Sequence, residues 1–365
     1  MDLDRRSCAA ILVATGATLA GCGRGAPPLF ESLAPAATGV SFMNRLPEDS
    51  TFNILNYLYY YNGGGVAVGD VNNDGLPDLY FTSNLGANRL YLNRGNDRFE
   101  DMTGRAGVAD SEGWKTGVTM ADVNGDGWLD IYVSAVSYLG MHGHNVLYIN
   151  NRDGTFTDRT REYGLEFEGY STQALFFDYD GDGDLDMYLL NHSTHTEHAV
   201  GSIADRRVRN PRAGDRLYRN DGGHFTDVNE QAGIYGGVEG FGLGVVASDL
   251  NLDGCPDLYV ANDFQENDFL YFNNCDGTFT ESIATATGHT SRFSMGVDAA
   301  DFNDDGRPDL VVLDMLPERE EILKTSANAE SYTLHDLKLR AGYRPQYARN
   351  TLQLNRGERR FSDEM

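Results

Sequence analysis

One acidic loop of nine residues recurs five times in this chain, and it constrains the fold more than any other feature. Each copy has a carboxylate or amide side chain at positions 1, 3, 5 and 9 and a glycine at position 6. Alternate residues of a tight loop turn their side chains toward one centre, and Ca²⁺ takes six to eight oxygen ligands of this kind. The copies span residues 70–78, 122–130, 178–186, 249–257 and 301–309.

The pattern predicts five calcium sites. The side chains at positions 1, 3, 5 and 9 are the predicted ligands, together with the backbone carbonyl at position 7, where the residue type is free to vary. The loop resembles the first nine positions of an EF-hand, but it lacks the glutamate of position 12. The predicted ligand residues are Asp70, Asn72, Asp74, Leu76 and Asp78; Asp122, Asn124, Asp126, Trp128 and Asp130; Asp178, Asp180, Asp182, Asp184 and Asp186; Asp249, Asn251, Asp253, Cys255 and Asp257; and Asp301, Asn303, Asp305, Arg307 and Asp309.

A unit of four short strands surrounds each loop. A strand of small residues precedes the loop, a second strand follows it, and a hairpin of the form Leu-Tyr-x-Asn, turn, Phe completes the unit. Such units, at a period of about 50 to 70 residues, are typical of propeller blades. We therefore predict an all-β fold, a β-propeller of four-stranded blades with five blades present.

These units resemble the FG-GAP/VCBS repeats of integrin-α-type β-propellers. The stretches 62–70, 289–297 and 314–318 are further similar to bacterial cartilage-acidic-protein-like lipoproteins that carry a later ASPIC/UnbV domain. The resemblance implies calcium in the loop between the first and second strands of each blade, and a binding or adhesion role. It names no ligand, so carbohydrate and protein partners both stay open.

The charge of the chain bears on its partners. Fifty-five acidic against 29 basic residues give a formal net charge of −26, which excludes nucleic acid as a partner, because phosphates require Lys/Arg surfaces. The oligomeric state is left open.

The N-terminus carries the pattern of an exported lipoprotein. Arg5 and Arg6 precede an apolar run that ends in Leu19-Ala-Gly-Cys22, which resembles a bacterial lipobox. We predict a signal peptide over 1–21, lipidation of Cys22, a tether over 22–28, and a place in the cell envelope at the outer membrane. The alternative is a transmembrane helix, but the apolar run is shorter than the ~20 residues that span a bilayer.

Two further cysteines are predicted to pair. Cys255 and Cys275 lie symmetrically about Gln265, where a hairpin between strands 257–262 and 268–273 would turn. Opposed residues on antiparallel strands lie within disulfide range, and an export compartment permits the bond. The alternative is two free thiols.

Propeller topology places the calcium loops on one face and the loops between second and third strands on the other. On this second face we expect the tyrosine run 57–61 and several histidines. The candidate ligands for a transition metal or a small molecule there are His142, His144, His192, His195 and His198. The alternative is a set of polar side chains held by hydrogen bonds, because the loops show no closed metal signature.

Motifs for catalysis are missing from the sequence, so we predict a binding module and not an enzyme. The rival interpretation is an extracytoplasmic enzyme with its site on the second face, near Asp263, Glu266 and Asp268. A third is a scaffold for a further C-terminal domain.

The propeller is predicted to occupy 29–365. The segment from Leu29 to Gly39 is similar to the outer strand that begins at Phe99, so we expect the chain to start in mid-blade. The fifth unit stops within its own outer strand, which suggests a truncated seven-bladed propeller or a five-bladed ring with a spare strand. Residues 316–346 are an insertion with helical patterns over 318–324 and 329–340.

Overall fold

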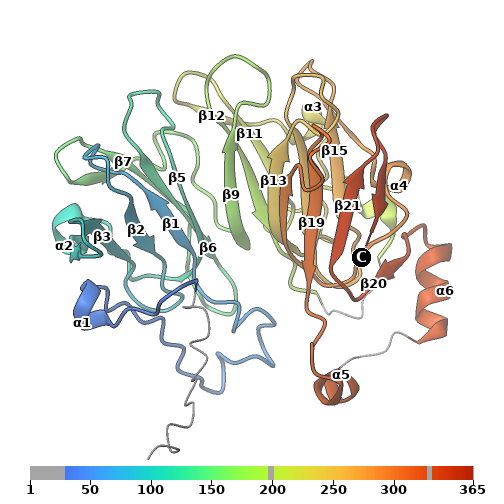
Figure 1. The fold of residues 1–365 in the computed structure, drawn as a ribbon, viewed down its shortest axis with the longest axis horizontal. Coiled ribbons are helices and arrows are strands. Elements are labelled where there is room, and N and C mark those ends of the chain that lie inside the picture. The colour runs from blue at the N-terminus through green and yellow to red at the C-terminus, as the bar shows by residue number, and fades with distance from the viewer. Residues whose placement is uncertain (1–28, 196–200, 327–330, 365) are drawn as a thin grey trace, which may run out of the picture.

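The computed structural model describes residues 29–195, 201–326 and 331–364, and it confirms the all-β fold. Within these residues, five antiparallel four-stranded sheets follow one another, each with its strands in sequential order. The sheets stand around a common axis as blades (Figure 1). The predicted cleavage and lipidation site at Cys22 lies outside the described residues, as does His198.

The strands of the five blades are, in order, β1 (Val66–Gly69), β2 (Asp78–Phe81), β3 (Arg89–Asn93) and β4 (Phe99–Asp101); β5 (Trp114–Ala121), β6 (Asp130–Val136), β7 (Val146–Asn150) and β8 (Phe156–Asp158); β9 (Ser171–Phe177), β10 (Asp186–Asn191), β11 (Arg216–Asn220) and β12 (Phe225–Asp227); β13 (Gly242–Ser248), β14 (Asp257–Asn262), β15 (Phe269–Asn273) and β16 (Phe279–Glu281); and β18 (Ser294–Ala300), β19 (Asp309–Asp314), β21 (Thr351–Asn355) and β22 (Phe361–Asp363).

Apolar side chains fill the spaces between neighbouring blades. Tyr80 and Leu90 of the first blade pack with Ile131 and Val133 of the second, and all four are almost fully buried. Similar clusters join the second blade to the third, the third to the fourth, and the fourth to the fifth. Successive side chains of a strand therefore point in turn toward the two neighbouring blades, because successive residues of a strand face opposite sides of the sheet.

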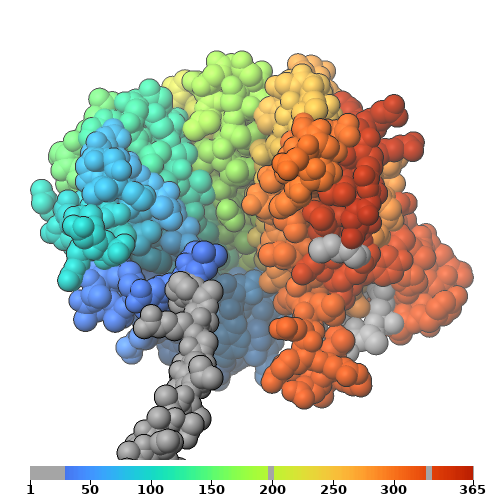
Figure 2. Space-filling model, viewed as in Figure 1, coloured from blue at the N-terminus to red at the C-terminus, as the bar shows by residue number. Residues whose placement is uncertain are grey.

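The first and fifth blades stand at the two ends of this arrangement. Figure 2 shows the surface hollowed between the first blade, in blue, and the fifth, in orange to red, with the green third blade behind. Val66 and Val68 of β1 are 57% and 61% exposed, whereas Ala67 between them is buried against the second blade.

The N-terminal segment corrects one sequence prediction. Residues 29–34 form no strand, and α1 (Pro35–Thr38) follows them. A strand needs a partner with which to exchange hydrogen bonds, and none of the sheets among the described residues includes this segment. The turn after α1 nevertheless packs against the first blade as the end of a blade packs against the next one. Gly39 has a φ of +87°, and a Cβ there would lie 2.4 Å from the carbonyl oxygen of Phe99. Gly107, which ends α2 (Thr103–Ala106), approaches the Phe156 carbonyl of the next blade in the same way.

Short helices and an insertion complete the fold. α3 (Asn229–Ala232) and α4 (Ile283–Ala286) follow outer strands as α2 does, and η1 (Ile203–Arg207) lies in the loop between β10 and β11. The insertion after β19 contains α5 (Glu320–Ser326), α6 (Tyr332–Arg340) and β20 (Gln346–Tyr347), which pairs in parallel with β17 (Thr290–Ser291). Figure 1 shows α5 beyond the lower ends of the strands. No described helix has both the length and the apolar character needed to cross a membrane.

Candidate functional site

The acidic loops join the first strand to the second in all five blades, so they share one face of the propeller. In the first loop the Asp70 carboxylate accepts hydrogen bonds from the backbone N–H groups of Asp74, at 3.1 Å, and Gly75, at 2.7 Å. Asn72 Oδ1 also accepts from Asp74 N, at 3.0 Å, and Asp74 Oδ1 accepts from Leu76 N, at 2.9 Å. These bonds fold the loop around its own side-chain oxygens.

Position 9 is buried at the base of each loop. Asp78 is 0% exposed, and its two oxygens accept from Val71 N, at 3.0 Å, and from Asn93 N on the third strand, at 2.8 Å. The equivalent aspartates of the other blades make the same pair of bonds. Position 9 thus ties the loop to the blade that carries it.

The third loop carries aspartate at position 3, where the other four carry asparagine. Oxygens of Asp178, Asp180 and Asp186 all lie within 4.8 Å of one another, and the Asp186 side chain is buried. Burial raises the pKa of Asp186 to about 7, and the nearby Asp180 and Asp182 add to this rise. Hard oxygen ligands in a negatively charged cluster suit a calcium ion, which would offset the repulsion that the aspartates exert on one another.

Neighbouring blades are coupled beside these loops by the asparagine of the Leu-Tyr-x-Asn hairpin. Asn150 Nδ2 donates to the Val71 carbonyl in the loop of the preceding blade, at 2.8 Å, and to Leu129 O in its own blade, at 3.0 Å. Asn220, Asn273 and Asn355 make the corresponding pair of bonds. The repeated asparagine is visible in the sequence, but its role between blades appears only in the structure.

The structure joins Cys255 and Cys275 in a disulfide, with Cα atoms 5.8 Å apart. The hairpin register differs from the predicted one by one residue, because Leu258 lies opposite Tyr271 and the centre of symmetry falls between residues 264 and 265. Cys275 has a φ of +57° in the turn between β15 and β16. This turn brings Cys275 to Cys255, so the bond ties the fourth loop to the adjacent hairpin tip.

The histidines of the opposite face are placed apart. His142 and His144 are exposed in the loop between β6 and β7, while His192 is 2% exposed and His195 lies 3.7 Å from Glu239. Among the described residues, no group of three His, Cys, Asp or Glu side chains within ligating distance includes a histidine. The structure therefore does not bring these histidines together into one cluster, and a ligand or metal site at them stays a prediction.

His192 has both ring nitrogens engaged. Nδ1 lies 2.8 Å from the Ser193 carbonyl, which can only accept, so Nδ1 carries the proton and Nε2 accepts from the Tyr57 hydroxyl at 3.0 Å. Burial lowers the pKa of His192 to about 4, so the ring is neutral at pH 7.

The three acidic residues singled out in the loop between β14 and β15 are buried and hydrogen-bonded. Asp268 accepts from the Tyr259 hydroxyl at 2.7 Å, and Asp263 accepts from the Tyr59 hydroxyl at 3.4 Å. Glu266 forms a bidentate ion pair with Arg206, whose side chain is 11% exposed. Asp263 therefore links the fourth blade to the segment before β1, and Glu266 links it to the third blade.

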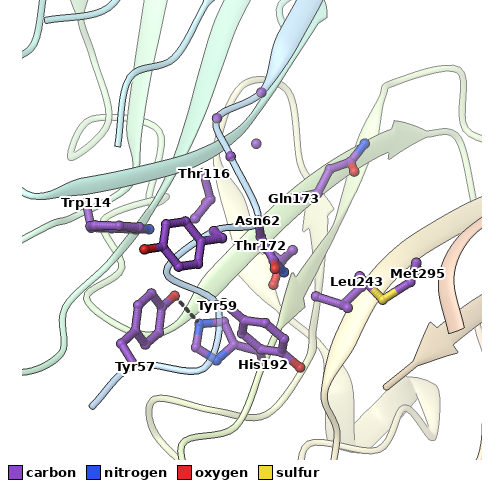
Figure 3. Close-up of a pocket in the computed structure, with 15 residues that line it drawn as sticks. Tyr57, Tyr59, Asn62, Trp114, Thr116, Thr172, Gln173, His192, Leu243 and Met295 are labelled. Atoms are coloured by element: carbon purple, nitrogen blue, oxygen red, sulfur yellow. Dashed lines mark hydrogen bonds between the residues drawn. The ribbon is translucent and has the colours of Figure 1, made fainter. Parts of the chain in front are cut away.

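A pocket of about 430 Å³ opens at the starts of the first strands, the ends opposite the calcium loops. All five blades contribute to its wall. Figure 3 shows Trp114 on one side of the pocket and Leu243 with Met295 on the other. The sequence predicts Tyr57, Tyr59, Tyr61 and His192 on this face. The other lining side chains were not predicted; they include Trp114, Thr172, Gln173, Leu243 and Met295. Their common signal is their place at the start of the first strand of a blade, one strand length before the acidic loop.

Buried aromatic rings form part of the pocket wall. The Tyr57 ring packs edge-on against Trp114, with centroids 5.4 Å apart, and against Tyr59, with centroids 6.3 Å apart. Tyr57 and Trp114 are 3% and 1% exposed. The segment before β1 passes close to the end of the second strand, since a Cβ on Gly64 would lie 2.1 Å from the Thr82 carbonyl oxygen.

Comparison with known families finds the FG-GAP-like repeat at residues 70–133, 135–189 and 249–312, which together make up half of the chain. Each matched segment contains one or more of the acidic loops described above. The family resemblance inferred from the sequence is thus confirmed.

Curated relatives point in the same direction. Cartilage acidic protein 1 of Mus musculus is 29% identical over 210 residues, covering 56% of this chain and 29% of that protein. The Xenopus tropicalis protein is 27% identical over 288 residues, covering 73% of this chain and 41% of that protein. The chain spans less than half the length of these relatives.

Among solved structures, the V. cholerae biofilm matrix protein Bap1 aligns with a TM-score of 0.37 and 15% identity, covering 68% of this chain and 34% of that chain. A putative exo-β-1,3-galactanase from Bifidobacterium bifidum aligns with a TM-score of 0.36 and 12% identity, covering 82% and 90%. Likeness at these scores identifies no function.

Proposed function

This chain belongs to the FG-GAP-like repeat family and is related to cartilage acidic protein 1, and from that premise we propose that it is a calcium-stabilised binding module of the cell envelope. One face of the propeller holds the ions, and the opposite face holds the ligand, a carbohydrate or a protein. The observation that carries the proposal is that the acidic loops lie on one face of the blades and the pocket lies on the other.

The donor set of the loops supports calcium. Each loop offers side-chain oxygens at positions 1, 3, 5 and 9 and a backbone carbonyl at position 7, with no nitrogen or sulfur donor required. Calcium would supply charge neutralisation and a crosslink within each loop, and no chemical step. The loop aspartates are therefore structural groups in this proposal.

The opposite face supports ligand binding. Its pocket lies in the size range of small-molecule sites, about 300 to 1,000 Å³, and it combines apolar walls with polar side chains. Loops that differ between blades converge there on a scaffold that repeats, which is the usual arrangement of a recognition surface.

The proposed location depends on the N-terminal pattern. A signal peptide over 1–21 and a lipid on Cys22 would hold the propeller at the outer membrane through the tether 22–28. Labelled palmitate should enter the wild-type chain and not Cys22→Ser; equal labelling of both would overturn the anchor.

The proposed function has two measurable parts. A native-state ligand stabilises by about 2.7 kcal/mol per site at a concentration of 100 times its Kd, so Tm should fall clearly when EGTA replaces calcium. In parallel, the calcium-loaded chain is passed over immobilised envelope polysaccharides and proteins. An unchanged Tm would exclude the calcium sites, and no binding to either class would exclude a binding module.

A further inference from the structure

We propose that the pocket at the starts of the first strands binds one unit of an uncharged saccharide. The Tyr61 ring is the stacking platform, and the side-chain amides of Asn62 and Gln173 recognise hydroxyl groups. This inference rests on the proposed function and names the ligand class for its binding face.

The charge of the wall argues for a neutral ligand. None of the described residues that line the pocket is Asp, Glu, Lys or Arg. His192 is kept neutral by its burial, and its Nε2 accepts the hydrogen bond of the Tyr57 hydroxyl. An ion that entered would lose its hydration without gaining a countercharge, which is costly. The net charge of −26 adds repulsion against any anion.

Tyr61 has the properties of a platform. Its side chain is 58% exposed, although the neighbouring Tyr60 is fully buried. Its hydroxyl donates to Glu48, and its ring packs edge-on against Tyr60, with centroids 5.1 Å apart. Tyr60 is in turn fixed by a hydrogen bond from its hydroxyl to the Pro47 carbonyl, at 2.9 Å. An aromatic face that is exposed and held in one orientation binds an apolar surface at little cost in entropy.

Two side-chain amides that line the same pocket are available for a ligand. Asn62 and Gln173 are exposed, and neither side chain is hydrogen-bonded to another of the described residues. Each amide offers an acceptor and two donors, which match the mixed donor and acceptor character of sugar hydroxyls.

The buried rings of the pocket argue against an aromatic cage for a quaternary ammonium ion. Such a cage needs open ring faces around the cation. Tyr57, Tyr59 and Trp114 are at most 6% exposed, and Tyr57 packs edge-on against the other two rings. Tyr61 alone among the lining aromatic residues presents a large exposed surface, and one face suits the apolar side of a sugar ring.

The test is a calorimetric titration of the calcium-loaded chain with methyl glycosides of glucose, galactose, mannose and N-acetylglucosamine. Glucuronate and choline serve as charged probes. At least one neutral glycoside should bind, and Tyr61→Ala should weaken it about tenfold or more, while Tyr61→Phe, which keeps the ring, should stay within about threefold. Gln173→Ala should weaken the same glycoside by about fivefold.

Matched controls lie outside the pocket. Tyr332→Ala replaces an exposed tyrosine of α6, and Gln231→Ala an exposed glutamine of α3, and both should bind as the wild type does. Unchanged binding by Tyr61→Ala, or tighter binding of glucuronate or choline, would overturn the proposal. Failure of every glycoside, in a chain that still binds an envelope protein and still gains Tm with calcium, would overturn the saccharide and leave the proposed function standing.

Discussion

The two faces of this propeller differ in whether their interactions repeat from blade to blade. On the calcium-loop face the bonds within a loop join residues at most seven positions apart, and the bonds of position 1 with the glycine N–H and of position 9 with the loop backbone recur in every blade. The bonds between blades made by the hairpin asparagines recur as well. On the opposite face Tyr57 contacts His192, 135 residues away, and Arg206 pairs with Glu266, 60 residues away. Each of these contacts occurs once. Repetition therefore belongs to the scaffold, and the individual contacts shape the pocket and the loops around it.

The largest effect on the free energy of unfolding is expected at Glu266. Its carboxylate is 1% exposed and paired with Arg206, so Glu266→Gln leaves a buried charge without a partner. We expect a loss of about 3 to 5 kcal/mol in the free energy of unfolding, measured by urea denaturation. Glu166→Gln breaks an exposed pair with Arg161 and should change stability little. Equal losses in the two variants would contradict the importance of the long-range contact.

The disulfide is the covalent link on the calcium-loop face. Cys255 and Cys275 are 20 residues apart, and a loop of this size corresponds to about 3 kcal/mol in the chain-entropy account. Cys255→Ser combined with Cys275→Ser should therefore lower the free energy of unfolding by about that amount. A reducing agent should lower Tm in the wild type and not in the double variant. A wild type that is insensitive to reduction would show that the bond contributes nothing.

Coupling between blades can be isolated by comparing two equivalent asparagines. Asn150 Nδ2 donates to the loop of the preceding blade, whereas among the described residues Asn93 Nδ2 of the first blade donates only to Pro77 O. Asn150→Ala should cost about 1 kcal/mol more than Asn93→Ala, because it removes one additional buried hydrogen bond. Equal costs from thermal or urea unfolding would mean that the bond between blades adds no stability.

A further effect concerns pH. Asp268 occupies the place that Asn145 has in the second blade, beside a buried tyrosine. Burial raises the pKa of Asp268 to about 7, and Asp314 adds to the rise. The folded chain thus holds a proton that the unfolded chain releases near pH 4, and this contribution to stability is lost as the pH rises through about 7. Asp268→Asn should make the free energy of unfolding fall less between pH 4.5 and 8. Identical slopes for variant and wild type would contradict the burial argument.

The sequence predicts the features that repeat in each blade well. The acidic loops, the Leu-Tyr-x-Asn hairpins and their place in each blade follow from repeated spacing, which defines strands, turns and faces together. The predicted strand at the N-terminus is wrong. The segment resembles a blade end only in α1 and Gly39, and a strand also needs a neighbouring strand with which to pair. The pocket could be assigned to a face but not to its residues, since Trp114, Gln173 and Met295 meet only after the blades pack.

The most direct test of the account is a count of calcium ions bound to the purified chain by equilibrium dialysis. We predict about five ions per chain in the wild type, one for each loop. Removal of the position-1 carboxylate in Asp178→Ala should lower the count by one and leave glycoside binding at the opposite face intact. A wild-type chain that binds no calcium would contradict the division between an ion-holding face and a ligand-binding face.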